Sequence, residues 1–152
     1  MERERNNIIV VDIDGTIAKV GDRLKYLQQE KKDWDAFYEH CDEDAPIEDM
    51  CRLVKDFHDL GYQIVFCTGR RESVRDKTQE WLIWNVKAVC ERELLMRKDG
   101  DWRHDTEVKP ELLAKARLTP ENVYLILEDR DSMVAKWREL GYRCLQVSEG
   151  KF

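Results

Sequence analysis

The sequence predicts a doubly wound α/β fold, in which helices cover both faces of a largely parallel sheet. Its apolar runs, rich in β-branched residues, are continuous rather than alternating, as in parallel strands that are buried on both faces. Segments with apolar residues at helical spacing lie between these runs. The 152 residues contain no repeat, low-complexity tract or linker, so we expect one domain over residues 1–152.

The first half of the chain is expected to supply two strands and a helix between them. Ile8–Val11 is a run of consecutive apolar residues and predicts the first strand, and residues 63–67 predict the second. The helix should begin near Pro46 and end before Gly61. Its buried face would consist of Ile47, Met50, Cys51, Val54 and Phe57.

The second half continues the alternation of helices and strands. It predicts a helix over 72–86, a helix over 110–117 opened by Pro110, a strand over Val123–Leu127, a helix over 132–140 closed by Gly141, and a strand over Tyr142–Val147. Strands that alternate with helices favour parallel pairing through right-handed crossovers.

Residues 19–45 interrupt this alternation and form an insert before the helix that starts near residue 47. Within it, Trp34, Phe37, Tyr38 and Cys41 have the spacing of a short amphipathic helix. Because the insert comes soon after the first strand, we expect it to overhang that end of the sheet as a small helical cap. A helix packed on the edge of the domain is the alternative.

The composition argues against a membrane protein and against a protein that coats nucleic acid. No apolar run approaches the ~20 residues of a membrane span, and the charged start lacks a secretion signal. A net charge of −6 does not suit contact with many backbone phosphates. Residues 69–117, with 12 Lys and Arg against 10 Asp and Glu, could still hold one phosphorylated end.

The cysteines indicate a reducing compartment. There are five, an odd number, with no C-x-x-C pair, so neither a disulfide framework nor a zinc site is expected. A cytoplasmic location fits this usage best. Cys67 precedes a candidate site residue, but it ends an apolar run and is interpreted as a buried structural thiol.

The segment Asp12-Ile13-Asp14-Gly15-Thr16 directly follows the first strand. The Asp12 carboxylate can attack phosphorus and form an aspartyl-phosphate, which divides hydrolysis into two easier steps. Asp14 is expected to point to the same side, where it can protonate the leaving oxygen and then activate water. Gly15 allows a turn whose N–H groups face phosphate oxygens, and Thr16 adds a hydroxyl.

Two structural explanations compete for this acidic segment, an Asx turn and a calcium loop. An EF-hand counted from Asp12 requires Glu at its twelfth position, but that residue is Arg23, and a strand rather than a helix precedes the segment. The partners of Asp12 elsewhere in the chain favour phosphate chemistry instead.

Two of these partners are expected at the same edge of the sheet, since ligands of open α/β sheets bind at the carboxyl ends of the strands. Thr68-Gly69-Arg70 follows the second strand, so its hydroxyl can donate to a phosphoryl oxygen while the glycine allows close backbone approach. Lys109, expected just before a helix, would neutralise charge and hold Asp12 in position. Taken alone, these are equally well explained as a turn with a surface arginine and as an ordinary surface lysine.

The remaining partner is Glu128-Asp129, which follows the strand predicted over 123–127. Two adjacent acids at a buried strand end are costly unless a cation compensates them. Mg²⁺ suits oxygen ligands that it shares with a substrate phosphate. A structural salt bridge from Arg130 is the alternative.

Taken together in this order, the four segments resemble the signature motifs of the haloacid dehalogenase (HAD) superfamily of phosphatases. The resemblance implies a Rossmann-like core, an aspartyl-phosphate intermediate and Mg²⁺. It also implies that Asp12 and Asp129 bind the metal through their side chains and Asp14 through its backbone carbonyl. Glu128 would complete the metal site from behind these ligands.

A longer likeness within the superfamily is to the 3′-phosphatase domain of phage polynucleotide kinase. Residues 97–105 fit its R-x-x-G-D-x-R-x-D pattern, and the ending from Glu128-Asp129-Arg130 to Phe152 is also similar. The acidic pair of that family is often Asp-Asp, so Glu128 is a departure. No G-x-x-x-x-G-K-[ST] loop occurs, so the kinase half and its ATP site are not expected.

This second likeness implies roles for several arginines. Arg70, Arg97 and Arg130 would bind the terminal phosphate or support the site, and Arg103 and Asp105 share the same pattern. Without the resemblance, residues 97–105 would be interpreted as a charged, solvated turn. Trp102 could stack on a terminal base or pack on its own domain.

We therefore expect a Mg²⁺-dependent HAD phosphatase whose substrate is a 3′-phosphorylated DNA or RNA end. A phosphatase of nucleotides or other small monoesters is the first alternative, because a small cap leaves the choice of substrate open. A non-catalytic phosphate-binding module is the second, but such a module would be expected to lack the nucleophile or the metal-binding acid, and both are present.

Overall fold

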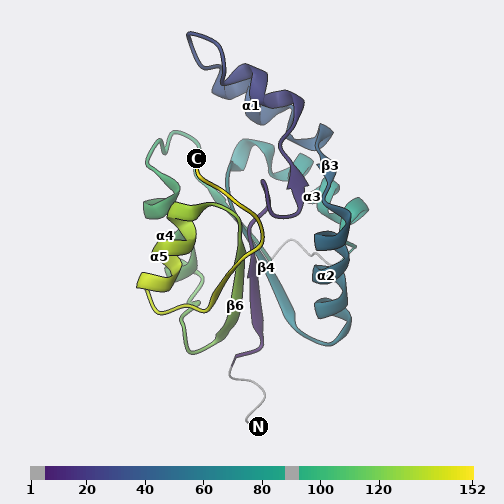
Figure 1. The fold of residues 1–152 in the computed structure, drawn as a ribbon, viewed down its shortest axis with the longest axis vertical. Coiled ribbons are helices and arrows are strands. Elements are labelled where there is room, and N and C mark those ends of the chain that lie inside the picture. The colour runs from purple at the N-terminus through teal and green to yellow at the C-terminus, as the bar shows by residue number, and fades with distance from the viewer. Residues whose placement is uncertain (1–5, 88–92) are drawn as a thin grey trace.

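The structure is a computed structural model that describes residues 6–87 and 93–152, and Figure 1 shows its ribbon. Five parallel strands form one sheet in the order β5-β4-β1-β6-β7. The strands are β1 (Ile8–Val11), β4 (Gln63–Arg71), β5 (Leu94–Arg97), β6 (Val123–Glu128) and β7 (Cys144–Gln146). The short strand β1 therefore lies at the centre of the sheet.

Helices cover both faces of this sheet, as expected. They are α2 (Glu48–Asp59), α3 (Arg75–Asn85), which follows the 3₁₀ turn η4 (Glu72–Val74), α4 (Asp105–Lys115) and α5 (Asp131–Glu139). Figure 1 shows α2 on one side of the strands and α4 and α5 on the other. The predicted Rossmann-like α/β architecture is confirmed.

Two separate hydrophobic cores follow from the alternation of side chains along β1. Ile9 and Val11 face one side and belong to a cluster with residues of α2 and α3, including Leu82. Val10 faces the other side and packs with residues of α4 and α5, including Trp137. Successive side chains of a strand point to opposite faces, so one four-residue strand serves both cores.

The strand β5 was not expected from the sequence. Leu94, Leu95 and Met96 favour helices in isolation, and Arg97 ends the run with a charge. Pairing with β4 places these residues in the sheet, with Phe66 opposite Leu94 and Thr68 opposite Met96. Tertiary pairing therefore outweighs local preference in this segment.

The helix expected over 110–117 begins earlier, at Asp105, so the prediction that Lys109 precedes the helix was wrong. The ring of His104 caps α4 by accepting from the N–H of Thr106. Acidic residues in the first turn are favourable near the positive end of the helix dipole. Pro110 lies inside α4, where its ring removes one backbone donor, and Lys109 belongs to the helix rather than to the loop before it.

The insert contains the 3₁₀ turn η2 (Asp22–Tyr26), the helix α1 (Trp34–Glu39) and the 3₁₀ turn η3 (Cys41–Glu43). The antiparallel pair β2 (Ala18–Lys19) and β3 (Ala45–Pro46) joins its two ends. Figure 1 shows α1 beyond the carboxyl ends of the strands. One contact between the insert and the helices of the sheet domain is a hydrogen bond from the indole Nε1 of Trp81 to the carbonyl of Asp44, at 2.8 Å.

Four of the cysteines, Cys41, Cys51, Cys67 and Cys144, are buried free thiols, while Cys90 lies outside the described residues. Burial raises the pKa of the Cys67 thiol to about 12, which suits the structural role expected for it. Within residues 6–87 and 93–152, no helix has the length and apolar character needed to cross a membrane.

Two adjacent residues of α3 give a direct test of the packing. Leu82 is fully buried, whereas Ile83 is 51% exposed. Replacing Leu82 with alanine should lower the free energy of unfolding by about 2–5 kcal/mol, through lost burial and a cavity. The matched control Ile83→Ala should change it by less than about 0.5 kcal/mol. Urea denaturation measures both values, and similar losses in the two variants would contradict this placement of α3.

Candidate active site

The four predicted segments lie at the carboxyl edge of the sheet, and three of them come together at the ammonium group of Lys109. Its Nζ lies 2.6 Å from Oδ1 of Asp12, which follows β1, and 3.0 Å from Oε2 of Glu128, which ends β6. The hydroxyl of Thr16 donates to Oδ2 of Asp12 at 2.9 Å. All four side chains are buried, so the sheet edge holds a dense cluster of charges away from water.

Burial and mutual repulsion disfavour the charged forms of the acids Asp12 and Asp129 in this cluster. Burial, together with the negative charge of Glu128, raises the pKa of Asp12 to about 7, although Lys109 opposes the shift. Burial and the charge of Asp12 likewise raise the pKa of Asp129 to about 7. Burial disfavours the charged ammonium of Lys109, but Asp12 and Glu128 overcome this and raise its pKa well above the usual value. One lysine therefore compensates only part of the negative charge.

The arrangement of carboxylates fits a divalent cation. Asp12, Glu128 and Asp129 each offer one oxygen, and these oxygens lie within 4.8 Å of one another. Gly15, at φ +84°, is packed so closely that a Cβ there would lie 2.1 Å from Oδ2 of Asp129. Oxygen donors that are close together and only partly neutralised are the donor set that Mg²⁺ prefers.

The side chain of Asp14 does not approach this cluster but is held by two arginines. Its Oδ1 lies 2.6 Å from Nη2 of Arg70 and 2.7 Å from Nη2 of Arg23. Burial alone would raise the pKa of Asp14, but the charges of Arg70 and Arg23 outweigh it, and the net shift is downward. In this arrangement Asp14 is ionised, and it must leave the arginines before it can carry a proton.

Arg23 and Asp44 were missed as site residues in the sequence. Both come from the insert, and Arg23 donates to Asp44 through Nε at 2.9 Å and through Nη2 at 2.7 Å. Arg23 also lies over the ring of Phe37, 4.3 Å from its centroid. A buried arginine looks like any surface arginine in a charged segment, and only the fold brings Arg23 to Asp14.

The segment Thr68-Gly69-Arg70 lies within β4, which continues beyond the predicted end at residue 67, and the Arg70 side chain reaches Asp14. Arg70 is fully buried, and its backbone N–H donates to the hydroxyl oxygen of Thr68 at 3.1 Å. A Cβ on Gly69 would lie 2.5 Å from Oδ1 of Asp105, so a larger residue there would displace the Asp105 carboxylate. The role of the Thr68 hydroxyl toward phosphate remains a prediction.

Arg97 organises the loop that follows β5. Its Nε donates to the carbonyl of Gly69 at 2.9 Å, and its Nη1 donates to the carbonyls of Asp101 and Arg103 at 2.9 and 2.7 Å. Its Nη2 is paired with Asp105. The structure therefore places Arg97 as a brace between the loop and β4, and its predicted contact with substrate phosphate is not tested.

Arg103 and Arg130 lie farther from the carboxylate cluster. Arg103 is partly exposed and pairs with Asp101 and Glu111 on the surface. Arg130 is 3.3 Å from Asp105 and donates through Nε to the carbonyl of Phe152 at 2.8 Å. The alternative in which the Arg130 side chain neutralises Glu128-Asp129 is not what the structure shows, because Lys109 pairs with Glu128 instead.

Residues 6–152 match the family described as the phosphatase domain of polynucleotide kinase PNKP. The chain belongs to this family. The match covers nearly the whole sequence and agrees with the likeness seen in residues 97–105 and in the ending. A phosphatase domain of the HAD type is therefore established, together with the fold expected for it.

Solved structures agree with the PNKP phosphatase family. A chain of the Pnkp1/Rnl/Hen1 RNA repair complex superposes with a TM-score of 0.81 at 27% identity, over 97% of this chain and 44% of that chain. A second structure of the Pnkp1/Rnl/Hen1 complex gives 0.79 at 27% identity, over 97% and 48%. The PNKP-family domain described here thus spans a little under half the length of these two chains.

More distant structures share the fold alone. A haloacid dehalogenase-like hydrolase from Streptococcus pneumoniae superposes on the PNKP-family domain with a TM-score of 0.63 at 14% identity, over 93% of this chain and 84% of that chain. The CbbY protein of Rhodobacter sphaeroides, in complex with phosphate, gives 0.62 at 15% identity, over 97% and 87%.

The buried arginine of the insert can be tested against an exposed one. Replacing Arg23 with methionine leaves Asp44 without its main partner and Asp14 with Arg70 alone, and the free energy of unfolding should fall by about 3–5 kcal/mol. Arg103→Met removes two surface ion pairs, with Asp101 and Glu111, and should cost only about 0–1 kcal/mol for each. Chemical denaturation of both variants measures the difference. An Arg23→Met protein as stable as the wild type would contradict the burial of this network.

Proposed function

We propose that the chain is a Mg²⁺-dependent phosphomonoesterase that removes the 3′-phosphate from nucleic-acid ends through an aspartyl-phosphate. The observation that carries the proposal is the contact between Lys109 and Asp12 at 2.6 Å, beside the carboxylates of Glu128 and Asp129. A buried carboxylate held by a lysine beside a cation site is suited to attack on a phosphate dianion.

The reaction would proceed in two balanced steps. In the first, an oxygen of Asp12 bonds to phosphorus while the bond from phosphorus to the 3′ oxygen breaks, and Asp14 gives its proton to that oxygen. In the second, Asp14 takes a proton from water as the water oxygen bonds to phosphorus and the bond from phosphorus to the Asp12 oxygen breaks, which releases phosphate and restores the Asp12 carboxylate. Thr68, Gly69 and Arg70 are proposed to bind the phosphoryl oxygens.

For this chemistry Asp14 must exchange its arginine partners for a proton. Arg70 and Arg23 stabilise the ionised carboxylate and lower its pKa. A substrate phosphate that took over one of these arginines would weaken this stabilisation and allow Asp14 to become protonated. The negative charge of the substrate would thus prepare the acid that the first step needs.

The cation site is proposed to use the Asp12 and Asp129 side chains and the backbone carbonyl of Asp14, with Glu128 behind them. Mg²⁺, when bound, would neutralise these carboxylates and polarise the phosphoryl group. Lys109, at Oδ1, and Thr16, at Oδ2, would then keep the Asp12 carboxylate oriented for attack. The hydroxyl of Thr16 lies within hydrogen-bond distance of both Asp12 and Asp129, 3.3 Å from Oδ1 of the latter, and would keep these two carboxylates close together.

The proposal of a nucleic-acid end rests on family membership and on the similarity to chains of the Pnkp1/Rnl/Hen1 RNA repair complex. The domain would then prepare 3′ ends for ligation or priming during repair. A cytoplasmic location is proposed with it, because the four described cysteines are buried free thiols.

The choice of substrate can be tested by hydrolysis of matched phosphates. We expect the highest kcat/KM for a 3′-phosphorylated oligonucleotide, with lower values for the same sequence phosphorylated at its 5′ end and for a 3′-mononucleotide. Asp12→Asn should abolish release of phosphate from all three while the protein remains folded by circular dichroism. Equal rates on the three substrates would favour the small-molecule phosphatase, and full activity of Asp12→Asn would refute the covalent mechanism.

The cation site can be tested by chelation and by two isosteric variants. EDTA should stop turnover and added Mg²⁺ should restore it. Glu128→Gln should raise the Mg²⁺ concentration needed for half-maximal activity by about 10–100-fold, the effect expected for a group that orients metal ligands. Asp129→Asn should be more severe because it removes a direct ligand. Undiminished turnover in EDTA, or an Asp129→Asn variant less impaired than Glu128→Gln, would overturn the assignment.

A further inference from the structure

A hollow lies apart from the carboxylate cluster, between the insert and the loop that follows β5. Its volume is about 500 Å³, and the residues that matter for its chemistry are Lys31, Lys32, Trp34, Asp35 and Trp102. None of these side chains takes part in the reaction proposed above. We call this hollow the tryptophan groove.

Trp34 and Trp102, which line the tryptophan groove, are the two ends of a stack of flat groups from two parts of the chain. The rings of Trp34 and Tyr38, both on α1, are stacked with centroids 6.1 Å apart. The guanidinium of Arg71 lies 4.7 Å from the centroid of Tyr38 and 4.3 Å from that of Trp102. Arg71 therefore joins the insert to the loop after β5 through two cation–π contacts.

The ring of Trp102, at one end of the stack, is open to solvent. Trp102 is 69% exposed although Arg71 covers part of its ring, so much of the indole faces solvent. Nη1 of Arg71 pairs with Asp35 at 2.6 Å, whereas Nη2 is buried and has no hydrogen-bond partner among residues 6–87 and 93–152. The exposed indole of Trp102, with Arg71 fixed beneath its ring, is suited to stacking by a flat ring.

The charges that remain at the tryptophan groove favour an anion. Asp33 caps α1 by accepting from the N–H of Ala36, and Asp35 is engaged by Arg71. Lys32 lies over the ring of Trp34, 5.9 Å from its centroid. Lys31 makes no ion pair within the part of the chain that the structure describes. The two lysines thus supply positive charge to which phosphate groups are attracted.

The tryptophan groove is connected to the catalytic edge through β4. Arg71 follows Arg70 directly, and the two side chains point to different sites, Arg70 to Asp14 and Arg71 to Trp102. The hydroxyl of Tyr38 lies 3.4 Å from the carbonyl of Gly69, which also accepts from Arg97, the brace of the Trp102 loop. A chain whose terminal phosphate lies at Asp12 would thus have its preceding nucleotides beside the groove.

We propose that the tryptophan groove binds the unpaired nucleotides that precede the terminal phosphate, with one base stacked on the open face of Trp102 and backbone phosphates near Lys31 and Lys32. Stacking on an aromatic platform requires a base that is free of its neighbours, so the groove selects single-stranded ends over blunt duplex ends. This inference rests on the proposed function for the identity of the substrate.

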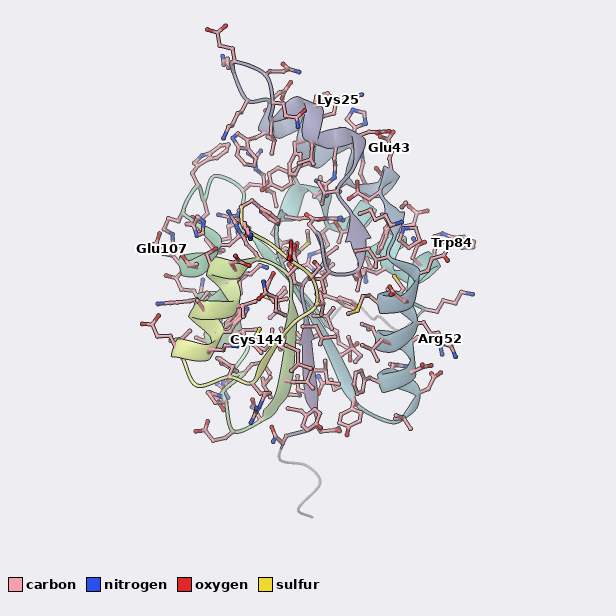
Figure 2. The ribbon with its side chains drawn as sticks, viewed as in Figure 1. Lys25, Glu43, Arg52, Trp84, Glu107 and Cys144 are labelled. Carbon is pink, nitrogen blue, oxygen red and sulfur yellow. The ribbon has the colours of Figure 1, made fainter. Side chains whose placement is uncertain are left out.

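The first test compares Trp102→Ala with Trp84→Ala. Trp84 is 73% exposed on α3, and Figure 2 shows it projecting from the side of the molecule, away from the part of the insert marked by Lys25. Trp102→Ala should lower kcat/KM on a single-stranded 3′-phosphorylated oligonucleotide by about 5- to 150-fold, the usual effect of losing one stacked base. The loss on p-nitrophenyl phosphate should be clearly smaller, and Trp84→Ala should match the wild type on both substrates.

The base itself can be removed as a second perturbation. Oligonucleotides with an abasic residue at the first, second or third position from the 3′ end should include one that the wild type hydrolyses as poorly as Trp102→Ala hydrolyses the intact strand. Trp102→Ala should not distinguish that abasic strand from the intact one, because the contact is already lost. Equal sensitivity of the wild type and the variant at every position would overturn the proposal.

Binding without turnover separates this inference from the proposed function. The Asp12→Asn protein should bind a single-stranded oligonucleotide with a 3′-hydroxyl more tightly than the matched blunt duplex, and adding Trp102→Ala should remove that preference. If the preference is present but the wild type hydrolyses no 3′-phosphorylated strand, the groove stands and the proposed reaction fails. If the wild type hydrolyses such strands but the preference is absent, the groove proposal fails alone.

Discussion

The buried ammonium group of Lys109 is the interaction on which the rest of the site depends. It lies between Asp12 and Glu128, two carboxylates that come from neighbouring strands and would repel each other without it. Breaking a buried ion pair leaves an uncompensated charge, which costs about 3–5 kcal/mol. The early start of α4 matters for this reason, because a helical backbone places the lysine more firmly than the loop that the sequence suggested.

A second buried network joins the insert to the strands. Asp14 and Asp44 share Arg23 and Arg70, so a carboxylate from the loop after β1 and one from the insert are held by the same two cations. The insert therefore has an electrostatic connection to the proposed acid as well as packing contacts. Its position and the ionisation of Asp14 are coupled, because moving Arg23 away would remove part of what keeps that carboxylate charged.

The main sheet and the carboxylate cluster could be predicted because their signals are local. Apolar runs mark β1, β4 and β6, and polar residues at their ends must share one edge once the strands are parallel. Strand β5 could not be predicted in this way, since its leucines and methionine become a strand only by pairing with β4. Arg23 and Asp44 are 21 residues apart in the insert, and no periodic pattern in the sequence predicts that they pair.

The central strand has a consequence for how this protein can vary. Ile9, Val10 and Val11 each contribute to one of two cores, and Asp12 is the next residue in the same run. A slip of one residue in the pairing of β1 would exchange the occupants of the two cores and turn the nucleophile away from the lysine. An insertion or deletion within this strand would therefore impair the fold and the proposed catalytic site together.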